Sequence, residues 1–136
     1  MISFIVPAHN EELELPATLA AIHAAAMAVA QPYQIIVVDD ASTDVTSKVA
    51  MRAGAKVVRI ERRQIAAARN AGGQAAQGEY LFFVDADTRI KQTHITEAIT
   101  ALQAVTHVAA RAWQWMDSFR FGDACYYAGF RRFTSV

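Results

Sequence analysis

Cysteine is almost missing from this sequence: Cys125 is the only one among 136 residues. A lone cysteine excludes an internal disulfide, which fits a reducing compartment. The start of the chain also lacks the basic residues of a secretory signal, and Pro7, His9 and Glu11 interrupt any signal-like apolar core. We therefore expect a cytoplasmic protein, with association to a membrane left open.

An excess of charge is missing as well, because 13 Lys and Arg residues balance 13 Asp and Glu residues. This balance gives no reason to expect nucleic acid as a partner. The longest apolar stretch, residues 15–30, contains Pro16, Thr18 and His23 and is too short to span a bilayer. Hydrophobic residues still make up 54% of the chain, so we expect one domain with a real core.

Segments typical of strands alternate along the chain with segments typical of helices. We expect strands at residues 2–6, 35–38, 57–60, 80–84 and 108–115. We expect helices at residues 11–29, from about 45 to 53, at 64–77 and at 93–105. Short loops join these segments, and this alternation predicts an α/β fold with a mostly parallel sheet and helices on both of its faces.

The most polar clusters of the sequence follow three of the expected strands, at residues 7–12, 39–42 and 85–88. In the last of them, Asp85 and Asp87 stand one residue apart directly after an apolar strand. The carboxyl ends of parallel strands meet at one edge of a sheet, where open α/β sheets bind ligands, so the clusters predict one cleft. Carboxylate oxygens suit hard cations such as Mg²⁺ and Mn²⁺, which often bring phosphates with them.

Four segments, residues 4–12, 37–44, 69–72 and 78–87, resemble the family 2 glycosyltransferases of GT-A fold in both order and spacing. The resemblance implies that the sheet is the Rossmann-like, nucleotide-binding half of that fold. It also implies a single nucleotide-sugar-binding domain over residues 1–136, with a donor half at 1–107 and an aromatic-rich tail at 108–136. The C-terminal part that binds the acceptor in this family is expected to be missing.

The resemblance implies transfer of a sugar from a UDP- or GDP-sugar to an unknown acceptor, with inversion and with help from Mn²⁺ or Mg²⁺. By position, Asp87 should bind the metal, and Asp85 the metal or the ribose. Asp40 should read the base, and Arg69 should reach the nucleotide. The remaining nucleotide-binding residues implied by the resemblance are Pro7, Ala8, His9, Glu11 and Asp39.

The end of the sequence shows no recognisable acceptor motif. Asp117 and Asp123 are the only carboxylates after Glu97, and neither lies in a familiar motif, so the catalytic general base stays unassigned. Residues 119–133 interleave aromatic side chains with arginines. Such a tail fits ordinary packing, self-association, or peripheral contact with a membrane that carries a lipid-linked acceptor.

Other functions remain open at this point. The chain could be an inactive nucleotide-sugar-binding module. A receiver domain of signalling proteins has a similar acidic pair, but it needs a later lysine and no lysine follows Lys91. A haloacid-dehalogenase phosphatase has a motif similar to residues 84–88, but it places the threonine one position later than Thr88. Asp39 and Asp40 could also serve only as turn and helix caps, and His9 could be a plain surface residue.

Overall fold

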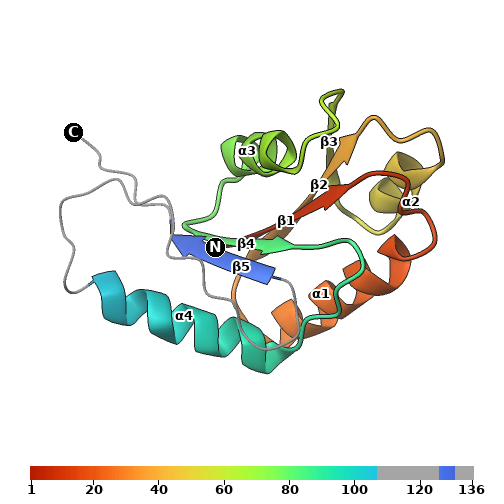
Figure 1. Cartoon of the computed structure of the whole chain (residues 1–136). Helices are drawn as coiled ribbons and strands as arrows, with labels where there is room; N and C mark the ends of the chain where they lie inside the picture. The colour runs from red at the N-terminus through yellow and green to blue at the C-terminus, as the bar shows by residue number, and fades with distance from the viewer. Residues whose placement is uncertain (107–125, 131–136) are drawn as a thin grey trace.

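The computed structural model describes residues 1–106 and 126–130, and these form one α/β unit around a five-stranded sheet (Figure 1). Its elements in chain order are β1 (Ile2–Ala8), α1 (Leu15–Val29), β2 (Tyr33–Asp40), α2 (Thr46–Arg52), β3 (Lys56–Ile60), α3 (Ile65–Ala75), β4 (Tyr80–Val84), α4 (Gln92–Thr106) and β5 (Tyr126–Phe130). The strand order is β3-β2-β1-β4-β5, and only β5 is antiparallel to its neighbour. The predicted mostly parallel sheet is confirmed.

Helices cover both faces of the sheet, as the sequence predicts. Figure 1 shows α3 on one side of the sheet and α1 and α4 on the other. Phe4, Leu19 and Ile95 are fully buried in the larger core, which lies under α1 and α4. Ile5 and Ala68 belong to the smaller core under α3. Strands buried on both faces explain why β1 and β2 read as nearly continuous apolar runs.

The strands β1 and β4 separate near their carboxyl ends. β1 stays paired with β2 through Ala8, but its pairing with β4 ends at Ile5. The order of the strands reverses at this point, because β2 and β3 lie on one side of β1 and β4 lies on the other. Open α/β sheets bind ligands at such a switch point. We expected β1 to stop before Pro7, but it continues to Ala8. The pairing with β4 has ended at Ile5, so at Pro7 the strand β1 has a paired neighbour only on its β2 side. A strand tolerates proline at such an edge-like position.

Proline also sets the start of α1. We expected this helix to begin at Glu11, but it begins at Leu15 with Pro16 in its first turn, the place where a helix tolerates proline best. The preceding turn is closed by the Leu15 N–H, which donates to the Glu11 carbonyl at 2.9 Å. α2 ends as predicted before Gly54, whose φ is 80°. The other predicted boundaries lie within two residues of the observed ones, and β4 begins and ends where predicted; differences of one or two residues are ordinary scatter at element ends.

Gly72 allows α3 to lie close against the sheet. A Cβ atom at this position would stand 2.2 Å from Cγ2 of Ile5 and 3.0 Å from Cγ2 of Val38. No side chain fits in that space, so a glycine is required where the helix crosses β1 and β2. The close approach fixes the height of α3 above the carboxyl ends of these strands.

One part of the aromatic tail belongs to the sheet. β5 pairs with β4 from Tyr126 opposite Val84 to Phe130 opposite Tyr80, a strand that we did not predict. The strand predicted at 108–115 and the rest of the tail lie outside the described residues. Within residues 1–106 and 126–130, the helices are all too short or too polar to cross a membrane.

Candidate functional site

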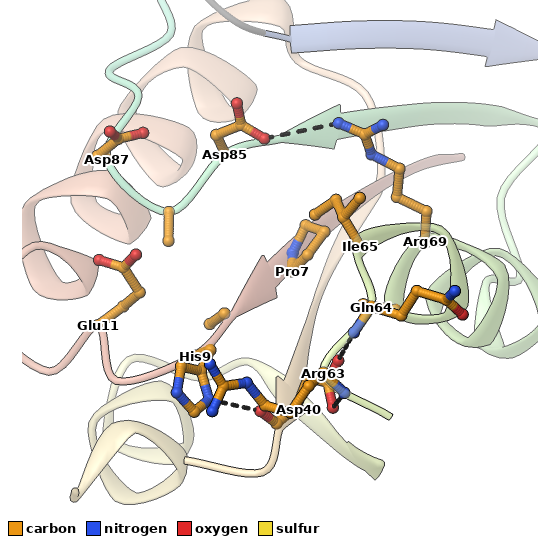
Figure 2. A pocket seen from close by; sticks show the side chains of 13 residues that line it. Pro7, His9, Glu11, Asp40, Arg63, Gln64, Ile65, Arg69, Asp85 and Asp87 are labelled. Atoms are coloured by element: carbon orange, nitrogen blue, oxygen red, sulfur yellow. Dashed lines mark hydrogen bonds and ion pairs between the residues drawn. The ribbon is translucent and has the colours of Figure 1, made fainter. Parts of the chain in front are cut away.

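An open cavity of about 460 Å³ lies at the carboxyl ends of the central strands (Figure 2). It is lined by Pro7, Ala8, His9, Glu11, Asp40, Arg63, Gln64, Ile65, Ala68, Arg69, Asp85, Ala86 and Asp87. The three polar clusters of the sequence thus meet at one cavity. Asp39 is the one predicted site residue that does not line it. Position in the lining does not assign a ligand, so the individual roles remain predictions.

One end of the cavity is acidic. Figure 2 shows Asp85 and Asp87 across the cavity from His9 and Asp40, with Glu11 between the two groups. Burial raises the pKa of Asp85; the cation of Arg69 lowers it, the carboxylate of Asp87 raises it further, and the net shift is upward. Burial also raises the pKa of Glu11, and the charge of Asp87 adds to the rise. We call Glu11, Asp85 and Asp87 the acidic end.

Arg69 reaches this end from α3. Its Nη2 lies 3.8 Å from Oδ1 of Asp85, and both side chains are about one third exposed. This distance exceeds that of a hydrogen bond, so the two groups attract each other across solvent-accessible space. A partly exposed pair of this kind leaves Asp85 able to bind another cation.

The opposite end is organised around Asp40, which is only 5% exposed. Its Oδ1 accepts hydrogen bonds from the N–H groups of Arg62 and Arg63, both at 2.8 Å, and its Oδ2 accepts one from Gln64 N–H at 2.9 Å. Burial alone would raise the pKa of Asp40, but these three bonds outweigh it and the pKa is lowered. A carboxylate has about four acceptor positions, so about one remains for a ligand.

His9 is held beside Asp40 by both of its ring nitrogens. Nδ1 lies 2.7 Å from the carbonyl oxygen of Asp40, which only accepts, so Nδ1 carries the proton and donates. The side-chain oxygen of Asn10 accepts from the Thr43 N–H at 2.8 Å, which turns the Asn10 amide N–H₂ toward Nε2 of His9 at 3.2 Å. Both ring nitrogens of His9 thus have partners within the protein, so His9 offers a ligand its face rather than a free nitrogen. We call His9, Asp40 and Arg63 the nucleoside end.

Asp39 faces away from the cavity and is 1% exposed. Its carboxylate accepts from the Ser42 N–H at 3.0 Å and from the Ser47 hydroxyl. Burial opposes ionisation, but the bonds from Ser42 and Ser47 outweigh it and the pKa of Asp39 is lowered. These contacts shape the turn between β2 and α2, and a contact of Asp39 with nucleotide stays an untested prediction.

The lining also includes Arg63, Gln64 and Ile65, which we did not single out from the sequence. They follow β3, an expected strand whose carboxyl-end loop we left out of the predicted cleft. The sequence could have indicated these residues, because all parallel strands have their carboxyl ends at the same edge of the sheet, and the loop after β3 is therefore expected there too. Arg63 also adopts a left-handed φ of 48°, which no sequence pattern announced.

The acidic end fits a divalent cation through the chemistry of its oxygens. Asp85 and Asp87 supply carboxylates of the kind that Mg²⁺ and Mn²⁺ bind. In the described part of the chain, no group of three or more His, Cys, Asp or Glu side chains is arranged to hold a metal ion. Two carboxylates alone suit an ion that takes its other ligands from outside the protein, as Mg²⁺ commonly does from water and substrate phosphates.

Comparison with known sequences places these residues in context. A family model described as glycosyl transferase family 2 matches residues 3–121. An uncharacterised glycosyltransferase of Mycobacterium tuberculosis is 42% identical over 86 residues, which are 63% of this chain and 36% of the relative. The undecaprenyl-phosphate 4-deoxy-4-formamido-L-arabinose transferase of Aeromonas hydrophila is 31% identical over 108 residues, 74% of this chain and 33% of the relative. The chain thus spans about a third of the length of these curated relatives.

Solved structures show the same fold. Residues 1–349 of S. aureus TarS, in complex with UDP-GlcNAc, match with a TM-score of 0.65 and 25% identity over 83% of this chain and 36% of that one. Glucosyl-3-phosphoglycerate synthase of Mycobacterium tuberculosis, in complex with Mn²⁺, UDP and glucosyl-3-phosphoglycerate, matches with a TM-score of 0.63 and 26% identity over 75% and 39%. A mannosyltransferase of Pyrobaculum calidifontis, with GDP-Man and Mn²⁺, matches with a TM-score of 0.62 and 28% identity over 74% and 32%.

Proposed function

Because this chain belongs to glycosyl transferase family 2, we propose that its cavity binds a nucleoside diphosphate sugar and presents the sugar for transfer to an acceptor. The observation that carries the proposal is the polarity of the cavity. Hydrogen-bonded groups build one end, and carboxylates with raised pKa values occupy the other. A nucleotide sugar has a matching polarity, with a base at one end and a diphosphate that attracts cations at the other.

The roles of the residues follow from this orientation. The base lies at the nucleoside end, where the free acceptor position of Asp40 takes an N–H of the base and the face of His9 packs against the nucleoside. Pro7 and Ala8 also line the cavity, and Glu11 of the acidic end lies on the side of that end that faces His9. Arg69 lies near the diphosphate and balances part of its charge.

The acidic end would hold Mn²⁺ or Mg²⁺ through Asp87 and Asp85. When bound, such an ion acts as a Lewis acid that stabilises charge on the leaving diphosphate. Two of the similar structures named above contain Mn²⁺ together with UDP or GDP-Man, which supports this assignment. We propose an inverting transfer, in which a general base activates the acceptor hydroxyl. We assign no residue to that role, since Asp117 and Asp123 lie outside the described residues.

The acceptor is unknown. A relative whose name specifies undecaprenyl phosphate makes a lipid-linked phosphate the first acceptor to test. Whether the chain alone completes the transfer is a separate question from donor binding. An inactive nucleotide-sugar-binding module would bind the donor without turning it over, so turnover and binding should be measured on the same preparation.

Calorimetry tests the proposal directly. UDP and GDP are each titrated into the protein with Mn²⁺ and again with EDTA, and uridine and guanosine serve as ligands that lack the diphosphate. We expect one of the two diphosphates to bind, with tighter binding in Mn²⁺, because the carboxylates of the acidic end otherwise repel it. Asp87→Asn should abolish the gain from Mn²⁺ and leave binding of the nucleoside unchanged.

Glu97→Gln is the matched control, since it removes one carboxylate from the exposed face of α4, away from the cavity. This variant should keep the full gain from Mn²⁺. Failure of both diphosphates to bind the wild-type protein would refute the proposed function. A gain from Mn²⁺ that survives in Asp87→Asn would refute the metal assignment alone.

A further inference from the structure

A buried hydroxyl group on α1 contacts the loop that carries the acidic end. Thr18 is fully buried on a helix face that otherwise carries Leu15, Leu19 and Ile22. Its hydroxyl donates a hydrogen bond to the carbonyl oxygen of Ala86, the residue between Asp85 and Asp87. A hydroxyl inside an apolar core costs free energy unless it is hydrogen-bonded, and here its partner is the backbone of the acidic loop.

Arg89 adds a second connection between α1 and the same loop. Its Nη1 donates to the hydroxyl oxygen of Thr18, and its Nη2 pairs with Oε2 of Glu14 at 2.7 Å. The loop is thus attached to α1 before Asp87 through Ala86 and after Asp87 through Arg89. We call Glu14, Thr18 and Arg89 the α1 brace.

The loop has its own internal contact as well. The Thr88 N–H donates to the Asp85 carbonyl at 3.0 Å, which closes a tight turn around Asp87. Ala86 and Thr88 are buried on either side of Asp87, which is exposed. The turn alone would fix the local shape of the loop, whereas the brace fixes its position relative to the rest of the cavity.

A role of the Thr18 hydroxyl within its own helix explains its contacts less well than a role toward the loop at Ala86. The hydroxyl also lies 3.2 Å from the carbonyl of Glu14 on its own helix, a common contact for threonine inside helices. A hydroxyl has only one proton to donate, and the contact with Ala86 is the shorter of the two. Valine would fill the same space without any polar atom, so a helix that needed only packing has no use for the hydroxyl.

We propose that Thr18 and Arg89 are positioning residues, which hold Asp85 and Asp87 in the arrangement that binds a metal-complexed diphosphate. The proposal rests on the proposed function of the cavity. Carboxylates bind a small cation well only when their separation is fixed in advance, and groups that orient such ligands contribute to metal affinity without touching the metal. Among the described residues, no hydrogen bond or ion pair joins the brace to the nucleoside end, so we expect the brace to act on the acidic end.

Two substitutions of Thr18 test the hydroxyl. Thr18→Val keeps the shape and removes the hydroxyl, whereas Thr18→Ser keeps the hydroxyl and removes a methyl group. Calorimetry with UDP and GDP, in Mn²⁺ and in EDTA, measures the gain from metal. We expect Thr18→Val to weaken Mn²⁺-dependent binding roughly tenfold, the lower end of what loss of a group that orients a metal ligand costs. Thr18→Ser should stay close to wild type, and uridine and guanosine should bind all three proteins alike.

Amide hydrogen exchange without metal or nucleotide supplies a readout that does not depend on ligand. Exchange should become faster at residues 86–89 in Thr18→Val, should stay unchanged there in Thr18→Ser, and should not change at residues 62–64 in either. If Thr18→Val fails to fold, Arg89→Met takes its place, because the Arg89 side chain is partly exposed and methionine keeps much of its stem.

The outcomes separate this inference from the proposed function. Wild-type protein that binds neither UDP nor GDP overturns the proposed function, and the inference with it. Wild-type protein that gains affinity from Mn²⁺, together with a Thr18→Val variant that gains equally, overturns the inference alone. Equal losses in Thr18→Ser and Thr18→Val also overturn it, because the hydroxyl would then play no part.

Discussion

The two ends of the cavity are built in opposite ways. At the nucleoside end, Asp40 receives three backbone N–H groups and its pKa is lowered. At the acidic end, Glu11 and Asp85 have raised pKa values because burial and the nearby charge of Asp87 disfavour their ionised forms. The protein stabilises the first set of charges by itself. The carboxylates of the acidic end, in contrast, lie in an arrangement that an added cation would stabilise.

This difference has a physical consequence for binding. The polar groups of the nucleoside end already have hydrogen-bond partners within the protein, so this end selects a ligand by shape and by its few remaining acceptor positions. Little conformational entropy is then lost when the ligand binds. An end with mutually repelling carboxylates depends on a cation and therefore couples ligand binding to metal. The comparison predicts that substitutions at the nucleoside end act mainly on folding and base binding, whereas those at the acidic end act mainly on metal dependence.

The largest expected effect is on stability at the nucleoside end. Asp40→Asn should lower the free energy of unfolding by about 3 kcal/mol, since an amide has one acceptor oxygen and turns its own N–H₂ toward backbone donors. Chemical denaturation measures this loss. Binding of uridine or guanosine should fall as well, because Asp40 lines the cavity.

Asp39→Asn is the matched comparison for this variant. Asp39 is also buried and hydrogen-bonded, but it does not line the cavity. We expect it to destabilise the fold without weakening nucleoside binding to the folded protein. Similar losses of nucleoside affinity in the two variants would show that base binding depends on the whole β2 loop and not on Asp40.

A medium effect is expected in the pH dependence of stability without metal. Glu11 and Asp85 have pKa values in the folded protein above their ordinary 4.5 and 3.8, so they lower stability when ionised. Acidification from neutral pH toward these ordinary values should relieve that cost. The pKa of Asp40 lies below 3.8 in the folded protein, so the stability from its ionised form is complete above pH 3.8 and is lost as the pH falls through the lower value.

Unfolding measured across this range checks the two opposite trends. The contributions of Glu11 and Asp85 should rise on acidification, and the contribution of Asp40 should fall below pH 3.8. Glu11→Gln should reduce the rise and leave the fall in place. A profile that is unchanged in Glu11→Gln would contradict the assignment of repulsion to the acidic end.

The smallest expected effect concerns Arg69. Arg69→Met should change the free energy of unfolding by less than about 1 kcal/mol, because a partly exposed ion pair contributes little. The pKa of Asp85 should rise further, since the cation that lowers it is gone. Carbon-detected NMR titration of the Asp85 carboxyl group reads this change. A pKa of Asp85 that falls would contradict the electrostatic description of the acidic end.

Sequence patterns were sufficient for the elements with strong, regular signals. The run Ile35–Val38 predicted a strand buried on both faces, and the alternation of elements predicted the parallel sheet. The end of β1 near Pro7 and the start of α1 near Pro16 were predicted wrongly. The effect of a proline in a strand depends on which neighbouring strands are still paired there, and its effect in a helix depends on which turn it occupies. β5 was missed because its pairing partner, β4, lies more than forty residues away in sequence.

The sequence by itself determined the family, the α/β alternation and the three acidic loops, because these depend on local periodicity and on residue types at fixed spacing. Only the tertiary structure decided which carboxylates face the cavity. Asp39 and Asp40 are adjacent in sequence, yet their side chains point to opposite sides of a strand, so one shapes a turn and the other lines the site. The link from Thr18 to Ala86 spans 68 positions, and no local pattern encodes a contact between segments that meet only when the helix packs on the sheet.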